Sequence, residues 1–180
     1  QWLRGNIKAD QSDIYIFFAG HGMATPDGKD LYLIPYDGKP SLLEYSALSR
    51  DEIFKDLEGF NPRSVTMFID ACYSGVSRDD EMLLADARPI SIVPIETDVP
   101  QNFTVFSASS GSEISGSLPE AEHGLFSYFL MKGMEGEADM NSDQQITAGE
   151  LHVYVQNKVR RQAIRLGREQ TPQLQGDTDK

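Results

Sequence analysis

Two short apolar segments of this chain each end at a residue with reactive chemistry, and this arrangement restricts the fold more than any other feature. Residues 14–19 run Ile-Tyr-Ile-Phe-Phe-Ala and lie two positions before His21. Residues 65–69 run Val-Thr-Met-Phe-Ile and lie three positions before Cys72. Short runs rich in β-branched and aromatic residues predict buried strands. If the two strands finish side by side, His21 and Cys72 meet at the same edge of a sheet.

The rest of the chain alternates between strand-like and helix-like segments. We expect a fully buried strand over Asp13–Ala19, a second buried strand over Ser64–Asp70 and a third strand over 103–109. A short extended piece over Leu31–Ile34 follows a loop at 21–30. Helices are expected over 2–9, from the Ser49 capping box to Asn61, over 124–134 and over 148–166. This alternation predicts an α/β fold with a largely parallel sheet. Ligands of such sheets bind beyond the carboxyl ends of the strands.

The chain is long enough for one domain over residues 1–180, with one unusual connection. Residues 76–102 hold three prolines and six acidic residues with weak periodicity, and we expect a mobile, exposed loop there. Three clear strands are few for a sheet covered on both faces. Because the chain also begins at Gln1 rather than Met, we expect it to be N-terminally incomplete, with at least one strand supplied by an upstream portion.

Charge and cysteine content narrow the possible partners. The chain has 16 Lys and Arg against 28 Asp and Glu, a net charge of −12, so nucleic acid is not an expected partner. An acidic surface most often serves only solubility, but it would also favour basic peptides. A single cysteine excludes an internal disulfide and any zinc site that needs two cysteines of one chain. No apolar run is long enough to span a bilayer and no signal peptide is visible. We therefore expect no membrane partner and a cytoplasmic location.

Cys72 and His21 stand in surroundings that suit a nucleophile and its imidazole partner. A free cysteine has a pKa of about 8.5, so a catalytic one needs a neighbouring imidazole or open backbone amides to form thiolate at neutral pH. Gly75 lets the backbone turn after Cys72 and expose amides to an oxyanion. Gly20 and Gly22 leave room for a peptide backbone beside His21. The pattern predicts a cysteine peptidase.

Other assignments for these residues remain open. Cys72 could be a buried core thiol, although the neighbouring Asp70 and Tyr-Ser-Gly are unusual for a core position. His123, also followed by glycine, is a second candidate imidazole, and its place before an apolar run favours a helix entry. His152 lies on a predicted helix and is expected to pack or face solvent. A metal site formed by His21, His123 and Cys72 is conceivable but lacks helical ligand spacing.

Several motifs together resemble the caspase-like cysteine peptidases, and most closely their metacaspase and bacterial orthocaspase branch. Cys72 follows His21 by 51 positions, which agrees with the separation of about 50 residues in caspases. The matching segments are His21-Gly22, Asp70-Ala-Cys72-Tyr-Ser-Gly75, Leu33-Ile-Pro-Tyr-Asp37, His123-Gly-Leu-Phe-Ser-Tyr128, Gly136-Glu-Ala-Asp-Met-Asn141 and Gln170-Thr-Pro172. The resemblance therefore covers nearly the whole chain.

The resemblance implies a fold and a mechanism. The fold would be a three-layer sandwich around a mostly parallel, six-stranded sheet, whose first strands precede the strand that carries the histidine. Cys72 would attack the scissile carbonyl and form an acyl-enzyme, and His21 would protonate the leaving amine and then activate water. The amides of Gly22 and Cys72 would form the oxyanion hole. This chemistry requires no cofactor.

The resemblance also bears on the substrate. In metacaspases a carboxylate two residues before the nucleophile lines the pocket for a basic side chain, and Asp70 occupies that position. We expect cleavage after Arg or Lys, with Ser107, Ser109 and Glu113 as further substrate-binding residues. The alternative is that Asp70 only caps the turn that follows it. Ala19 departs from the serine of many metacaspases, which leaves the details of the pocket open.

A preference for basic residues would make the long loop a substrate of its own enzyme. Arg78 and Arg88 lie within residues 76–102 and are candidate sites of autocleavage. The alternative is that both are solvated charges of an exposed loop. Self-processing there would be an activation step.

One segment follows the pattern of a calcium-binding loop. Residues 139–150 place oxygen-bearing side chains at positions 1, 3, 5, 7 and 12 of an EF-hand loop, namely Asp139, Asn141, Asp143, Gln145 and Glu150. Gln144 stands where glycine is expected, at a left-handed position that costs about 1–2 kcal/mol for other residues. The segment could instead be a hydrogen-bonded turn. Metacaspases suggest a second acidic cluster, from Asp79 or Asp80 with acids of residues 27–37.

Three functions follow from these observations. The first is a cysteine endopeptidase acting on proteins or peptides, as a monomeric catalytic unit within a longer protein and with calcium as a possible activator. The second is a catalytically silent scaffold with the same fold, which intact His21 and Cys72 disfavour. The third is a calcium-sensing interaction module, which Gln144 disfavours.

Overall fold

The computed structural model describes residues 2–73, 98–111, 113–118 and 122–179. The greater part of the predicted loop at 76–102, with Arg78, Asp79, Asp80 and Arg88, lies outside these residues. Expectations for that loop therefore stay predictions.

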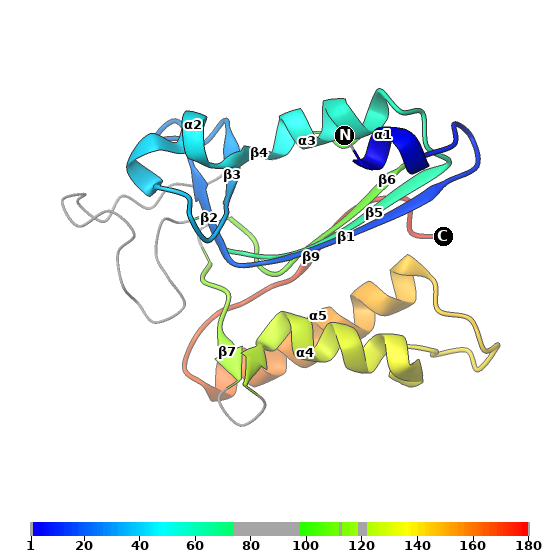
Figure 1. The fold of residues 1–180 in the computed structure, drawn as a ribbon. Coiled ribbons are helices and arrows are strands. Elements are labelled where there is room, and N and C mark those ends of the chain that lie inside the picture. Colours follow the sequence, from blue (N-terminus) through cyan, green and yellow to red (C-terminus); the bar gives the residue numbers. More distant parts are fainter. Residues whose placement is uncertain (1, 74–97, 112, 119–121, 180) are drawn as a thin grey trace.

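A four-stranded sheet forms the centre of the molecule (Figure 1). Its strands are β1 (Asp13–Ala19), β5 (Ser64–Asp70), β6 (Phe103–Ser107) and β9 (Gln173–Gly176), in the order β1-β5-β6-β9. The first three are parallel to one another, and β9 runs antiparallel to β6. The predicted α/β class with a mostly parallel sheet is confirmed. The third strand ends at Ser107, two residues earlier than expected.

Helices cover both faces of this sheet. Figure 1 shows α1 (Trp2–Asn6) and α3 (Arg50–Glu58) on one face and α4 (Leu125–Lys132) and α5 (Ala148–Arg165) on the other. The three-layer arrangement expected from the resemblance is therefore present. The predicted cap at Ser49 forms, since its hydroxyl accepts the amide of Glu52, and Thr147 and Glu150 form a capping box at the start of α5 that the sequence analysis did not predict.

Each face of the sheet has its own apolar core because successive side chains of a strand point to opposite sides. On the α3 side the largest fully buried side chains include Val65, Met67, Ile69, Phe103 and Val105. On the α4 and α5 side the core includes Phe68, Phe106, Leu125, Phe126, Val155 and Val159. Residues 65–69, apart from the half-buried Thr66, and residues 103–106 are buried for this reason.

β1 differs from the strand predicted for the same residues. Tyr15 is 72% exposed and Phe17 is 57% exposed, so the expectation of a fully buried strand was wrong on this face. Among the described residues β1 is an edge strand, and only its other face packs against a core cluster, through Ile14 and its neighbours. Periodicity alone did not reveal this because the segment is apolar on both faces.

A second, antiparallel sheet continues from the end of β1. It consists of β2 (His21–Ala24), β3 (Leu31–Ile34) and β4 (Leu48–Ser49). The 3-10 turn η1 (Pro40–Leu42) and the short helix α2 (Leu43–Ser46) connect the last two strands. The sequence predicted a loop from residue 21, but pairing with β3 makes residues 21–24 a strand. His21 therefore opens a paired strand.

The chain after β6 completes the fold with short elements. β7 (Ser117–Leu118) pairs with β8 (His123–Gly124) directly before α4. A π-helical turn, η3 (Gly133–Glu137), follows α4. In the ranges that the structure describes, no helix combines the length and apolarity needed to cross a bilayer.

Candidate active site

The backbone brings the segments of His21 and Cys72 together at the carboxyl ends of β1 and β5. The two strands are parallel neighbours in a register that pairs Ala19 with Asp70. Beyond this pair the Gly20 amide donates to the Asp70 carbonyl at 3.1 Å, and the Ala24 amide donates to the Tyr73 carbonyl at 3.1 Å. These two bonds lie on either side of His21 and of Cys72. The proposed nucleophile and imidazole thus belong to adjoining backbone segments.

Gly22 is the point of closest approach between the two segments. A β-carbon at this position would lie 2.7 Å from the Cys72 carbonyl oxygen and 3.0 Å from the Tyr73 ring. Separations this short are not available to a real side chain, so residue 22 must be glycine while β2 stays against the backbone of Cys72. The sequence singled out Gly22 for substrate access, and the structure adds this packing constraint.

The sulfur of Cys72 is held by the segment that follows β6. Cys72 is only 4% exposed, and its Sγ accepts the Ser115 amide at 2.6 Å. Sγ also lies 4.0 Å from the Ser115 carbonyl oxygen, to which the thiol can donate. A donor directed at sulfur favours the thiolate over the thiol. The site therefore contains one feature that activates a cysteine.

Asp70 lies below the site with no exposed surface. Its carboxylate accepts hydrogen bonds from the Ser115 hydroxyl at 2.7 Å, from the Ser127 hydroxyl, and from the Ser127 amide at 3.3 Å. These donors come from other parts of the chain, so the carboxylate does more than cap the turn after β5. Two hydroxyl groups and one backbone amide, all neutral, are thus among the groups that contact the carboxylate.

The other predicted substrate-binding residues follow β6. Ser107 ends that strand, opposite Ile69 of β5 and Gln173 of β9, and both Ser107 and Ser109 are half-buried. Glu113 has a clear structural role, because its carboxylate accepts the Ser110 amide at 3.0 Å and both the amide and the hydroxyl of Thr171, at 2.6 and 2.9 Å. The Glu113 carboxylate thus connects its loop to the segment before β9 through hydrogen bonds.

Gln170 is a buried polar residue that the sequence analysis did not assign to the site. Its side chain is 1% exposed and donates from Nε2 to the Ala108 carbonyl at 3.0 Å. Its Oε1 accepts the Gly116 amide at 2.8 Å, and Nε2 lies 3.5 Å from the Ser115 hydroxyl. The motif 170–172 was noted in the sequence, but nothing local indicated what its glutamine would contact.

Tyr73, the residue after Cys72, does not lose its phenolic proton at neutral pH and so does not serve as a general acid there. Burial raises the pKa of its phenol to about 12, an effect that the positive charge of Arg50 partly offsets. Its hydroxyl is buried and lacks a hydrogen-bond partner among the described residues. Tyr73 therefore stays neutral, and its ring packs against Gly22.

The other two histidines occupy different surroundings. His123 is exposed on β8, opposite Leu118 of β7. His152 lies on α5, where its Nε2 is 3.2 Å from the Pro172 carbonyl oxygen. That carbonyl also accepts the side-chain amide of Gln156 at 3.0 Å. His152 thus packs within the fold, as the sequence suggested.

The EF-hand-like segment is a self-contained turn. Asp139 accepts the amides of Asp143 and Gln144 at 3.2 and 3.0 Å, and Asn141 accepts the Asp143 amide at 2.8 Å. Asp143 in turn accepts the amide of Gln145 at 2.8 Å, and Glu150 belongs to the cap of α5. Gln144 has a φ of 68°, the left-handed value that the pattern predicts. Calcium binding here stays a prediction.

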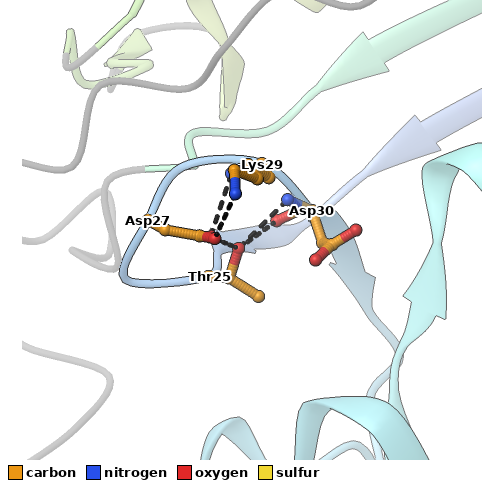
Figure 2. A network of polar contacts seen from close by, with 4 residues as sticks. All are labelled: Thr25, Asp27, Lys29 and Asp30. Carbon is orange, nitrogen blue, oxygen red and sulfur yellow. Dashed lines mark hydrogen bonds and ion pairs between the residues drawn. The ribbon is translucent and has the colours of Figure 1, made fainter.

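The second proposed acidic cluster includes the turn between β2 and β3. Figure 2 shows Thr25, whose hydroxyl donates to Asp27 at 2.7 Å, with Lys29 paired to the same carboxylate at 3.4 Å. The Thr25 hydroxyl and then the Lys29 amide lower the pKa of Asp27. Asp27 is thus engaged in its own turn. Within the described ranges, no group of three or more His, Cys, Asp or Glu side chains is placed to hold a metal ion.

Comparison with known proteins agrees with this architecture. The model of the family described as Caspase domain matches residues 1–180. No curated protein matches the chain. Among solved structures, the chain resembles protein GSU0716 from Geobacter sulfurreducens with a TM-score of 0.56 and 17% identity, over 97% of this chain and 70% of that one. At this identity the likeness concerns the fold alone.

Proposed function

The chain belongs to the caspase-domain family of cysteine peptidases, and on this premise we propose that it is an endopeptidase that cleaves peptide bonds after Arg or Lys. The observation that carries the proposal is the adjoining placement of His21 and Cys72 at the carboxyl ends of β1 and β5, above the buried carboxylate of Asp70. The substrates of such an enzyme are proteins or peptides.

In the proposed first half-reaction Cys72 acts as the nucleophile. Its thiolate attacks the scissile carbonyl carbon, a carbon–sulfur bond forms, and the carbonyl oxygen becomes an oxyanion that the amides of Gly22 and Cys72 stabilise. The close packing of Gly22 on the Cys72 carbonyl supports this role, because it keeps both amides on one rigid piece of backbone. His21 then protonates the leaving nitrogen, the carbon–nitrogen bond breaks, and the first product departs.

In the second half-reaction His21 changes from acid to base. The neutral imidazole takes a proton from water as the water oxygen attacks the thioester carbonyl. The carbon–sulfur bond breaks, the acid product leaves, and the thiolate returns to its bond with the Ser115 amide. Each turnover therefore restores the starting charges of both residues.

Asp70 supports the preference for a basic residue before the scissile bond. A carboxylate with no exposed surface acts through a medium that screens it little. The hydroxyl groups of Ser115 and Ser127 donate to this carboxylate and hold it in place at the end of β5. A cationic side chain entering the pocket above it is favoured, and an acidic side chain is repelled, by an amount on the order of 2–5 kcal/mol.

Self-processing at Arg78 or Arg88 follows from this preference. Both residues lie outside the described part of the chain, so their support is the sequence alone. A calcium site that includes Asp79 or Asp80 is likewise supported by the sequence alone. These two extensions do not affect the assignment of the peptide-cleaving residues.

A set of matched peptides tests the proposal. Purified protein is incubated with fluorogenic peptides that differ only in the residue before the scissile bond, namely Arg, Lys, Asp or Asn, with and without calcium. We expect kcat/KM to be highest for Arg and Lys, and cleavage to disappear in Cys72→Ala. Mass spectrometry of the long loop in the same samples would locate any cleavage after Arg78 or Arg88.

The outcomes separate the parts of the proposal. Cleavage after Asp rather than Arg would keep the peptidase and contradict the role of Asp70. Equal activity in Cys72→Ala would remove the nucleophile assignment. Lack of cleavage of every peptide by folded protein under both conditions would favour a catalytically silent scaffold.

A further inference from the structure

Gln170 is buried in a position that links the segment before β9 to the loop that follows β6. It lies just before β9, its side chain is 1% exposed, and its amide group uses both its oxygen and its nitrogen. Nε2 donates to the Ala108 carbonyl and Oε1 accepts the Gly116 amide. A long polar side chain is rarely buried without a requirement for such bonds.

The two backbone partners of Gln170 are the two ends of one loop. Ala108 follows β6 directly, and Gly116 precedes β7, so one side chain joins the beginning and the end of residues 108–116. The next residue, Thr171, holds the middle of the same loop through its two bonds to Glu113. The pair 170–171 thus contacts this loop at Ala108, Glu113 and Gly116.

The loop carries the donor that contacts the nucleophile candidate. Ser115 lies beside Gly116, and its amide donates to Cys72 Sγ at 2.6 Å while its hydroxyl donates to Asp70 at 2.7 Å. A hydrogen bond of this kind weakens steeply with distance and angle, so its strength depends on how firmly the donor is placed. Gln170 supplies the placement, because it bonds to the Gly116 amide and approaches the Ser115 hydroxyl to 3.5 Å.

We propose that Gln170 is a positioning residue for the nucleophile, which holds residues 115–116 so that the Ser115 amide stays directed at the sulfur of Cys72. The inference rests on the proposed function, in which Cys72 must be a thiolate to attack a peptide. Gln170 does not touch substrate. It acts through the backbone, and its loss moves the donor away and makes the thiolate harder to form.

The single cysteine of the chain allows a direct test that needs no substrate. The rate of alkylation by iodoacetamide is measured against pH for the wild type and for Gln170→Met, which keeps the length of the side chain but removes its polar atoms. The midpoint of this profile reports the pKa of the thiol, and the plateau at high pH reports access to it. We expect the midpoint to rise by about one pH unit, with alkylation about tenfold slower at neutral pH.

Two further variants separate positioning from general stability. Gln156→Met is the matched control, since it removes a 3.0 Å bond to the carbonyl of Pro172, two positions after Gln170, and a 3.3 Å contact with His152, but no bond to residues 115–116. We expect no shift of its midpoint, although thermal unfolding is measured for all variants. Thr171→Val removes one bond to Glu113 and keeps the amide bond, so we expect a smaller shift in the same direction as Gln170→Met.

The result that would overturn the proposal is a wild-type midpoint in both Gln170→Met and Thr171→Val, or an equal shift in Gln156→Met. If Gln170→Met does not fold, the alkylation midpoints of Thr171→Val and Gln156→Met are compared instead. A shift in Thr171→Val without one in Gln156→Met supports the proposal, and equal midpoints contradict it. Failure of the proposed function is recognised separately, as absence of peptide cleavage by wild-type protein whose alkylation midpoint nevertheless responds to Gln170→Met.

Discussion

The buried surroundings of Asp70 and the exposed turn at residues 139–150 both contain carboxylates, but the hydrogen-bond donors to these carboxylates come from different parts of the chain. Asp70 accepts from Ser115 and Ser127, which lie 45 and 57 positions further along the chain. In the turn, Asp139 and its neighbours accept from amides two to five positions away. The first arrangement exists only when three segments of the fold meet, whereas the second needs only one continuous segment.

This difference has a physical consequence for function. The turn is exposed, so water can replace any bond that a substitution removes there, and the loss stays local. The contacts of Asp70 are buried, and removing one partner there leaves another buried polar group without that bond. Changes near Cys72 and Asp70 should therefore have large effects on activity, and changes in the turn small effects confined to stability.

The largest effect is expected from the two residues of the proposed chemistry. Cys72→Ala and His21→Ala should each lower kcat/KM for an arginine peptide by about 10⁴-fold or more, because the covalent step is lost. The thermal midpoint should change little for His21→Ala, since His21 is exposed. Steady-state kinetics and calorimetry check this. Substantial turnover in either variant would contradict the catalytic role of the substituted residue. It would also remove the expected difference between the active site and the turn at residues 139–150.

The next largest effect is expected from the charge of Asp70. Asp70→Asn keeps the shape of the side chain but removes the charge that favours a basic residue, so kcat/KM for the arginine peptide should fall by about 10²–10³-fold. Peptides with neutral residues before the scissile bond should be cleaved as before. The free energy of unfolding should fall by about 1–3 kcal/mol as the serine bonds weaken. An unchanged ratio between arginine and neutral peptides would limit Asp70 to stability.

A smaller effect is expected from the packing of the two segments. Gly22→Ala places a β-carbon 2.7 Å from the Cys72 carbonyl oxygen, so the segments must separate. We expect kcat/KM to fall by about 10²-fold and the free energy of unfolding to fall by about 1–3 kcal/mol. Gly5→Ala is the matched control, because a β-carbon there meets nothing within 4 Å. Equal effects of the two substitutions would show that close approach at Gly22 is unimportant.

The smallest effect is expected at the turn. Thr147→Ala removes the cap in which the Thr147 hydroxyl accepts the Glu150 amide, at 3.2 Å, at the start of α5. The free energy of unfolding should fall by about 1 kcal/mol, measured by chemical denaturation, with kcat/KM unchanged at temperatures where the protein stays folded. A clear loss of activity in this variant would show that the turn and the active site are coupled, and the comparison would fail.

Several elements could be predicted from sequence because their causes are local. The strands Asp13–Ala19 and Ser64–Asp70 have the predicted bounds, and Ser49 caps α3 where the spacing indicated it. The left-handed Gln144 was also visible as a position in a pattern. The two incorrect predictions have non-local causes. The exposure of Tyr15 and the strand at His21–Ala24 depend on which segments of the chain lie beside them.

By itself the sequence determined that two parallel strands carry His21 and Cys72 to one edge of an α/β sheet, because apolar runs and their ends are local properties of the chain. Only the tertiary structure decided what surrounds that edge. Ser115 lies in a serine-rich segment, and Gln170 lies nearly one hundred positions after Cys72, so neither could be identified as a neighbour of the sulfur in advance. The bonds of buried polar groups depend on which distant segments the packed core brings together, and this information appears only when the chain is folded.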